Sequence, residues 1–171
     1  MTPRPEIRAE RPADTGPIFR ITEAAFRGHP HSQGTEPFIV DALREAGALT
    51  LSLVAERDGE VCGHIAVSPV GISDGAKGWY ALGPVSVAPE WQRQGIGSAL
   101  VRAALDALRR LGAEGCVLVG EPGFYGRFGF ASRPALSMEG VPQAFVLSLP
   151  FGTTAAAGDI VHHDAFNARR S

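Results

Sequence analysis

A glycine-rich turn between two apolar stretches is the part of this sequence best suited to chemistry. Gly95 and Gly97 lie in the run GPVSVAPEWQRQGIGSALV, residues 83–101, after a strand-like stretch and at the start of an amphipathic helix. The first amides of a helix lack intrahelical acceptors and carry the positive end of the helix dipole, so they stabilise a phosphate group without any lysine. Glycine lets the backbone approach phosphate oxygens closely, and Arg93 adds a positive charge nearby. The turn therefore predicts a phosphate-binding site.

Three kinds of phosphate-binding turn compete for this segment, and their residue spacing separates them. A P-loop requires GxxxxGK[ST], but the single lysine of the chain, Lys77, lies outside the turn. A dinucleotide-binding GxGxxG requires glycine where Leu100 stands, although Glu121 follows at the place expected for a ribose-binding acid. The third kind is a turn that binds the diphosphate of an acyl-coenzyme A. Its spacing is the one that the sequence matches.

The match to the third kind is a family resemblance. Residues 92–97, QRQGIG, resemble the Q/R-x-x-G-x-G/A signature of the GNAT superfamily of N-acetyltransferases, and a strand of the form V-x-V-x-P precedes them as in that family. A second segment, GEPGFYGRFGF at 120–130, is similar to GD/E-P-x-Y-Y-x-R-F-G-F in a branch of uncharacterised bacterial acetyltransferases. There Phe124 replaces the first tyrosine and Tyr125 keeps the second. Two motifs in the right order make the resemblance specific.

The resemblance implies a fold and a donor site. The fold would be of the mixed α/β class, with a central, mostly antiparallel sheet, one parallel and splayed strand pair, and flanking helices. The likeness covers about residues 5–150. In the family the splayed strand exposes backbone groups to the pantetheine arm of acetyl-CoA, and one amide, here that of Val87, polarises the thioester carbonyl. The residues implied to contact acetyl-CoA are Val85, Ser86, Val87, Gln92, Arg93, Gln94, Gly95, Ile96, Gly97, Ser98 and Tyr125.

Acetyl transfer to an amine requires a base for the amine proton and an acid for the leaving thiolate. By resemblance Tyr125 is the general acid, because the family places a tyrosine there near the coenzyme sulfur; the competing interpretation is a tyrosine whose ring packs in the core. The base stays open among Glu121, Glu36, His29 and His31. Exposed loop histidines are usually only solvated, and Glu36 is also a favourable charge in the first turn of a helix. His31 and Glu36 are the residues expected near the acceptor.

Two function hypotheses follow from these residues. The first is an acyltransferase that moves the acetyl group of acetyl-CoA to a primary amine, of a small molecule or a protein, by direct attack in a ternary complex. The second is a regulatory or interaction module that binds CoA without turnover. Tyr125 favours the enzyme. The acceptor is not specified by either motif, since a fold shared by many functions does not define it. Family members often form homodimers, but no feature of the sequence indicates the oligomeric state.

Composition excludes several other classes of protein. Sixteen basic residues against eighteen acidic ones give a formal charge of −2, so the broad positive field of a nucleic-acid or membrane-surface binder is missing. Apolar runs are far shorter than the roughly 20 residues of a membrane span, and the first ten residues do not resemble a signal peptide, so a cytoplasmic location is expected. Cys62, Cys116 and His64 lie in strand-like runs and are expected in the core or at its rim, with no metal site.

The hydrophobic pattern predicts the elements that position the turn. The chain, 1–171, shows no repeat or linker, which predicts one domain in which 151–171 form a C-terminal extension. Arg57-Asp58-Gly59-Glu60 predicts a hairpin, and Gly83-Pro84 predicts an interruption in a strand. The unit at 79–119 predicts parallel strands joined by a crossover helix. In chain order we expect a strand at 7–10, a helix capped by Asp14, a loop at 27–35, a helix capped by Thr35 and ending at Gly47, strands at 51–56, 61–68 and 79–87, a helix at 97–111, a strand at 116–119, a short helix at 122–128, a strand at 144–149 and an extended piece at 159–163.

Overall fold

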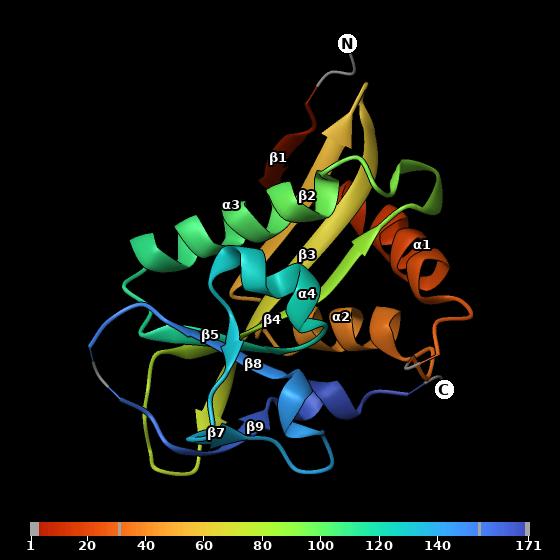
Figure 1. The fold of residues 1–171 in the computed structure, drawn as a ribbon. Coiled ribbons are helices and arrows are strands. Elements are labelled where there is room, and N and C mark those ends of the chain that lie inside the picture. Colours follow the sequence, from red (N-terminus) through yellow and green to blue (C-terminus); the bar gives the residue numbers. More distant parts are fainter. Residues whose placement is uncertain (1–3, 31, 154, 170–171) are drawn as a thin grey trace.

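The computed structural model describes residues 4–30, 32–153 and 155–169, which fold around one twisted sheet (Figure 1). The strands are β1 (Glu6–Ala9), β2 (Leu51–Arg57), β3 (Glu60–Ile72), β4 (Trp79–Val87), β5 (Gly115–Val119), β6 (Ala131–Ser132), β7 (Leu136–Ser137), β8 (Val146–Pro150) and β9 (Gly158–His162). The α-helices are α1 (Thr15–Phe26), α2 (Glu36–Glu45), α3 (Ile96–Arg110) and α4 (Pro122–Tyr125). Short 3-10 helices are η1 (Pro12–Asp14), η2 (Pro89–Trp91), η3 (Gly126–Phe128), η4 (Gln143–Phe145) and η5 (Asp164–Asn167).

The sheet is mostly antiparallel, as predicted. Its strand order is β1-β2-β3-β4-β5-β8-β6, and within this path β4 and β5 form the parallel pair that the crossover through α3 requires. A second parallel pair, which the sequence did not predict, joins β7 to β9, and β9 also pairs with the end of β3. The predicted mixed α/β class is therefore confirmed, with the short C-terminal strands as an addition to it.

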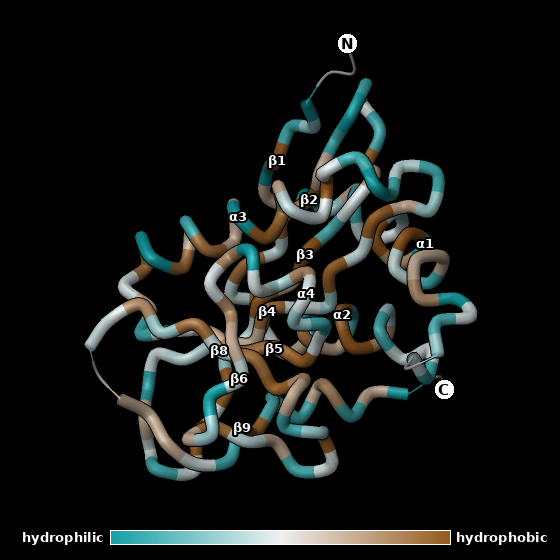
Figure 2. Tube along the Cα trace, in the orientation of Figure 1, coloured by the Kyte–Doolittle hydropathy of each residue, from teal (hydrophilic) through white to brown (hydrophobic). Residues whose placement is uncertain are grey.

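Helices cover both faces of the sheet (Figure 1). On one face α1 and α2 pack over β2 and β3 through a cluster that includes Ile18, Val40 and Val54. On the other face α3 and α4 enclose the larger cluster, in which Ile96 and Leu100 are fully buried. Residues along the central strands and the inner side of α3 are hydrophobic, and the outer side of α3 is hydrophilic (Figure 2). The amphipathic pattern of 97–111 therefore predicted the buried side of this helix, except for Leu111, which follows the helix and is 59% exposed.

Glycines end two helices and turn the hairpin as their positions predict. Gly47 has a φ of 69° and follows α2, and Gly112 has a φ of 78° and follows α3, each with the paired backbone hydrogen bonds of a left-handed cap. Asp58 and Gly59 both have positive φ, at 54° and 78°, which is the backbone of a type I′ hairpin between β2 and β3. Gly63 of β3 lets α3 lie close, because a Cβ there would be 3.1 Å from Ile96 and Leu100 atoms.

Two predicted N-caps are wrong in detail. Thr35 precedes α2 with helical dihedral angles and its side chain makes no capping hydrogen bond. Asp14 precedes α1, but its carboxylate accepts from the amide of Arg11 at 2.7 Å and so closes η1 instead. An ion pair with Arg8 at 2.7 Å holds Asp14 in that position. A partner from β1 therefore outweighs the local capping preference.

The last residues return to the sheet. Residues 160–162 of β9 pair with 70–72 of β3, which is longer than the predicted strand at 61–68. After β9, Ala165 and Phe166 pack on Ile39 and Leu43 of α2. The part of the chain that the structure describes contains no helix with the length and apolar character of a membrane span. The C-terminal extension thus covers the edge of α2 and lengthens the sheet beside β3.

Candidate functional site

Pairing between β4 and β5 stops halfway along β4. Residues 79–81 pair with 115–117 of β5, and beyond them only β3 pairs with β4. The interruption falls at Gly83-Pro84, a cis peptide bond, where the register against β3 also shifts between Ile65 and Val67. Proline has no amide hydrogen to donate, which accounts for the irregular register against β3 at this point. Residues 85–87 therefore form a strand edge without a neighbour on the β5 side.

The backbone groups of Val85 and Val87 face this unpaired edge. The amide of Ala88 donates to the carbonyl of Cys62 on β3 at 2.9 Å. Amides alternate in direction along a strand, so that of Ser86 also points to β3 and those of Val85 and Val87 point away from it. The Ser86 hydroxyl is 3.1 Å from Thr22 Oγ1, which donates to the Ile18 carbonyl, so Ser86 donates toward α1. Of the three strand residues predicted to contact acetyl-CoA, Val85 and Val87 thus present their amides to the unpaired edge, and Ser86 does not.

The predicted phosphate turn joins η2 to α3 and lies at the end of this edge. Arg93 and Gly95 have left-handed dihedral angles, with φ of 65° and 85°. A left-handed residue followed by a helical one, here Gly95 and Ile96, forms a concavity of amide groups that suits an anion. The first hydrogen bond inside α3 runs from Ala99 to the Gly95 carbonyl at 3.0 Å. The amides of residues 96–98 consequently have no acceptor within the helix.

Two glutamine side chains hold the turn in place. Gln92 donates from Nε2 to the carbonyl of Val87 at 3.0 Å, so this side chain connects the turn to the strand edge. Gln94 accepts from Nη1 of Arg57 at 3.0 Å, and the same guanidinium lies over the Trp91 ring at 4.9 Å. Arg57 is at the end of β2, and the sequence indicated it only as part of the hairpin. The backbone of the turn is therefore fixed from two sides.

Tyr125 lies at the end of α4, against the same face of the sheet as α3. Gly120 makes room for its ring, since a Cβ there would be 2.6 Å from ring atom Cε2. The ring contacts Phe124 edge-on, with centroids 4.8 Å apart, and Phe130 at 6.0 Å. Burial raises the pKa of Tyr125 above its usual value of 10.0. Among the described residues its hydroxyl has no hydrogen-bond partner, so it keeps a proton to donate.

The start of α3, the end of β4 and α4 meet at Gly97. A Cβ at this position would be 3.8 Å from Val87 Cγ2 and 3.9 Å from the Phe124 ring. Both are ordinary contact distances, so Gly97 lies directly beside the strand edge and the aromatic cluster of α4. The structure thus brings the predicted turn, the predicted edge and the segment of Tyr125 together around one residue.

The candidates for the base are more scattered. Glu121 is exposed at the end of β5, and its carbonyl accepts from the amides of Phe124 and Tyr125. Glu36 is in the first turn of α2 and accepts from the Ser32 hydroxyl at 2.6 Å. His29 is exposed next to Phe26, and His31 lies outside the described residues. Of these groups, Glu121 is the one that shares a segment with Tyr125.

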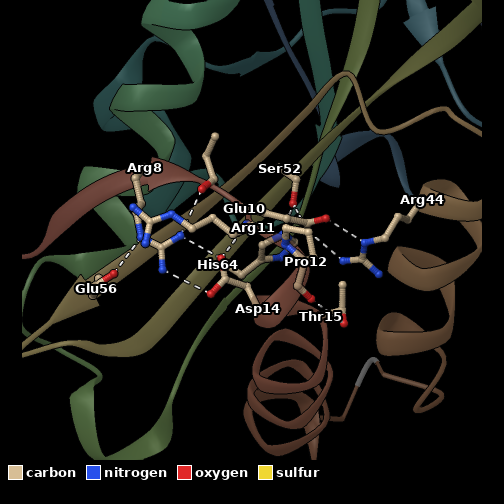
Figure 3. Close-up of polar contacts among 11 residues, drawn as sticks. Arg8, Glu10, Arg11, Pro12, Asp14, Thr15, Arg44, Ser52, Glu56 and His64 are labelled. Atoms are coloured by element: carbon tan, nitrogen blue, oxygen red, sulfur yellow. Dashed lines mark hydrogen bonds and ion pairs between the residues drawn. The ribbon is translucent and has the colours of Figure 1, made fainter.

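A partly buried polar network on the α1 and α2 side was missed by sequence reasoning (Figure 3). His64, fully buried on β3, is 2.8 Å from the Ser52 hydroxyl, which donates to Glu10 at 2.5 Å. Arg44 of α2 makes two hydrogen bonds to the Glu10 carboxylate at 2.8 Å. Burial lowers the pKa of His64 to about 4, so the ring is neutral at pH 7. Sequence reasoning placed His64 in the core or at its rim but gave no sign of its partners.

Within residues 4–30, 32–153 and 155–169 no group of three or more His, Cys, Asp or Glu side chains could hold a metal ion. Cys62 and Cys116 are both buried and free. Burial raises the pKa of both thiols. Neither sulfur is therefore a reactive thiolate at neutral pH.

This chain is similar in sequence and fold to proteins of known family. Residues 17–130 match the family model described as the acetyltransferase (GNAT) family. A GNAT family acetyltransferase from Brucella melitensis, crystallised with acetyl-CoA, is 52% identical, with a TM-score of 0.84 over 95% of this chain and 97% of that one. YhbS from Escherichia coli, crystallised with CoA, is 31% identical, with a TM-score of 0.82 over 98% and 95% of the two chains.

A sequence comparison agrees with the structural one. The chain is 36% identical over 125 residues to the uncharacterised N-acetyltransferase YhbS of Escherichia coli K12, which is 72% of each protein. The matched family model covers the two helices, the hairpin, the interrupted strand, the phosphate turn and the segment of Tyr125. The chain belongs to the GNAT family of acetyltransferases.

Proposed function

We propose that this protein transfers the acetyl group of acetyl-CoA to a primary amine by direct attack in a ternary complex. The observation that carries the proposal is the unpaired edge of β4, which leads directly into the left-handed turn at Gly95 and the start of α3. A thin chain that ends in a diphosphate fits such an edge and turn. The acetyl-CoA and CoA held by the Brucella and Escherichia coli relatives support the same donor.

The donor site divides into two parts in this proposal. The amides of residues 96–98 and the Arg93 guanidinium bind the diphosphate, aided by the positive end of the α3 dipole. The backbone of Val85 and Val87 binds the pantetheine arm, as a neighbouring strand would. The Val87 amide donates to the thioester oxygen, and one such donor aimed at developing negative charge contributes about 3 kcal/mol to catalysis. Gln92 supports this geometry by fixing the Val87 carbonyl.

Acetyl transfer then requires one group that accepts the amine proton and another that protonates the leaving thiolate. The amine nitrogen attacks the acetyl carbon, a C–N bond forms, the C–S bond breaks, and the amine proton leaves to a base. Tyr125 donates its hydroxyl proton to the departing thiolate, which suits a phenol whose pKa burial raises. Glu121, acting through water, is the proposed base because it lies at the end of β5, four residues before Tyr125. Glu36 is proposed to contact the acceptor.

The proposed enzyme is a single domain that works in the cytoplasm. Residues 1–171 form one N-acetyltransferase domain, which the pairing of β9 with β3 supports. Free, buried cysteines are compatible with a reducing cytoplasm. Sedimentation velocity determines whether the protein is a monomer or a homodimer.

Two measurements test the proposal. Isothermal titration calorimetry with acetyl-CoA is expected to show saturable binding, and no heat at millimolar ligand would overturn the assignment. Release of free thiol is then followed with a panel of polyamines, aminoglycosides, amino acids and peptide N-termini. Acetylation of at least one amine, confirmed by mass spectrometry, supports the enzyme. Tight binding without transfer to any amine, and with slow thioester hydrolysis that Tyr125→Phe leaves unchanged, would favour the binding module instead.

A further inference from the structure

A basic cavity lies on the outer side of the phosphate turn. Its volume is about 660 Å³, and it is lined by Arg4 before β1, Arg57 at the end of β2, Gln94 and Gly95 of the turn, and Arg102 of α3. These three arginines come from segments far apart in the sequence. Only the folded chain brings them together, and neither sequence motif includes any of the three arginines.

Arg57 is the deepest of the three arginines. The residue is only 5% exposed, and its Nε is buried without a hydrogen-bond partner in the described part of the chain. One guanidinium nitrogen, Nη1, donates to Gln94, and the plane of the group lies over Trp91. The group is therefore desolvated and held in a fixed orientation, with part of its donor capacity unused.

The charges around the cavity are uncompensated. Within the described ranges, no carboxylate lies within 4.0 Å of a guanidinium nitrogen of Arg4, Arg57 or Arg102, although such pairs do form at Arg8 and Arg44. A buried cation without a counter-charge is costly, and like charges around one space repel one another. An anion placed among them would relieve both costs. The planar guanidinium group also matches phosphate oxygens in a bidentate manner.

We propose that this cavity binds the 3′-phosphate of coenzyme A. The inference rests on the proposed function, because it assumes that the diphosphate occupies the neighbouring turn. Coenzyme A carries a phosphomonoester on its ribose in addition to its diphosphate, and the cavity shares Gln94 and Gly95 with the turn. A ligand anchored by its diphosphate thus presents its second phosphate group beside the three arginines. The protein distinguishes coenzyme A from its 3′-dephospho form by this contact.

The experiment compares acetyl-CoA with 3′-dephospho-acetyl-CoA by isothermal titration calorimetry on the full chain. We expect the wild-type protein to bind acetyl-CoA at least about tenfold more tightly, the size of effect expected from charge-assisted hydrogen bonds to one phosphate group. In Arg57→Gln and Arg102→Gln the Kd for acetyl-CoA rises toward that of the dephospho form. The Kd for 3′-dephospho-acetyl-CoA stays near its wild-type value in Arg102→Gln, whereas in Arg57→Gln it also rises, because this variant loses the hydrogen bond to Gln94 that holds the turn.

Arg102→Gln matters because its side chain is exposed and its loss leaves the packing of Arg57 on Trp91 intact, removing only its own contact over the Phe128 ring. The matched control is Arg110→Gln, an exposed arginine on the last turn of the same helix, and it keeps the wild-type affinity for both donors. Far-ultraviolet circular dichroism verifies that each variant is folded. Equal weakening of both donors in Arg102→Gln would overturn the proposal, since this arginine would then act on the shared diphosphate or on the turn.

Two further outcomes separate this proposal from the proposed function. If the wild-type protein binds both donors with equal affinity, the 3′-phosphate assignment is overturned while the acetyltransferase assignment stands. If it binds neither donor, both are overturned. In a last measurement, inorganic phosphate is titrated alone. Equal donor affinities, together with phosphate binding that Arg57→Gln abolishes, would show a site for a separate anion and overturn the 3′-phosphate assignment.

Discussion

Tyr125 is held in place by its ring, while its hydroxyl has no hydrogen-bond partner among the described residues. The contacts that fix the ring are edge-on contacts with Phe124 and Phe130 and the space left by Gly120. A phenylalanine would keep all of these contacts. The chemical role of the hydroxyl can therefore be separated from the packing role of the ring.

We expect Tyr125→Phe to lower kcat about 100-fold, the lower range for loss of a general acid. The KM for acetyl-CoA and the melting temperature change little. Because burial raises the pKa of Tyr125 above 10.0, the wild-type rate should not fall through tyrosine ionisation below pH 10. Steady-state kinetics between pH 6 and pH 10 check both statements. Tyr80→Phe, which removes the other tyrosine hydroxyl of the chain, is the control, and an equal loss in that variant would contradict the assignment.

His64 gives the protein a pH-dependent stability. Burial lowers its pKa to about 4, although the charges of Glu10 and Asp14 favour the protonated ring and that of Arg44 opposes it. The unfolded chain binds a proton at this residue below about pH 6.5, and the folded one does not until about pH 4. Stability is therefore lost as the pH falls from 7. Burial alone would raise the pKa of Glu10, but hydrogen bonds from Arg44 and Ser52 hold it below 4.5, so Glu10 stays charged in this range.

The free energy of unfolding should fall by about 2 kcal/mol through His64 between pH 7 and pH 5. Urea denaturation at both pH values measures this in the wild type and in His64→Gln. The variant is less stable at pH 7 and loses less stability on acidification. His162, whose pKa burial also lowers, adds a slope of the same sign to both proteins, so the difference between them is the test. An unchanged slope in His64→Gln would contradict the assignment.

At the scale of elements, the turn before α3 depends on backbone conformation at Gly95. Its φ of 85° is a left-handed conformation, while a Cβ would meet no atom within 4 Å. An alanine there would thus be strained by its backbone alone, at a cost of about 1–2 kcal/mol. The strain falls on the amides that we propose to bind the diphosphate.

Gly95→Ala should lower the unfolding free energy by about 1 kcal/mol and raise the Kd for acetyl-CoA several-fold, because the amide concavity relaxes. The matched control is Gly126→Ala. Gly126 has a helical φ of −58° and open space around its Cβ direction, so alanine fits there without strain. Calorimetric titration and urea denaturation of both variants check the prediction. Equal effects at the two positions would show that the conformation at Gly95 is unimportant.

Elements set by local chemistry could be predicted from the sequence, and those set by distant partners could not. The Asp58-Gly59 hairpin, the interruption at Gly83-Pro84 and the end of α2 at Gly47 each follow from residues that restrict their own backbone. Asp14 shows the opposite case, since Arg8 draws its carboxylate away from the expected cap. β6 and β7 are only two residues long and exist through their pairing with β8 and β9.

The candidate site also combines residues that a local motif identifies with residues that only distant partners bring into place. The turn and Tyr125 lie in two continuous motifs, so the resemblance could point to them, and their roles in the site stay predictions. Arg57 is 37 residues from Gln94 in the sequence, and its hairpin position gave no reason to connect the two. The base is equally hard to predict, since a carboxylate at a strand end acquires a role only through what lies near it. Glu121 and Glu36 therefore keep their roles as proposals.

For the whole molecule, the C-terminal extension contributes to stability through α2. Phe166 is half-buried against the cluster of Ile39, Leu43 and Ala48, and its ring lies over His162 with centroids 4.1 Å apart. Phe166→Ala should lower the unfolding free energy by about 2 kcal/mol, roughly half the cost of removing a fully buried phenylalanine. Urea denaturation measures the change. Asn167→Ala, an exposed neighbour, should change it by less than about 0.5 kcal/mol, and equal losses would mean that the extension does not pack as described.

Strand β3 has a consequence for how the molecule unfolds. One continuous strand of thirteen residues borders the unpaired edge of β4 through 63–65 and holds β9 through 70–72. The two ends therefore should not melt separately, and unfolding should be a single cooperative transition. The two tryptophans report on the two ends, because Trp79 packs with Ile160 of β9 and Trp91 lies beside the turn. In Trp79→Phe and in Trp91→Phe, the fluorescence of the remaining tryptophan should coincide with the loss of circular dichroism.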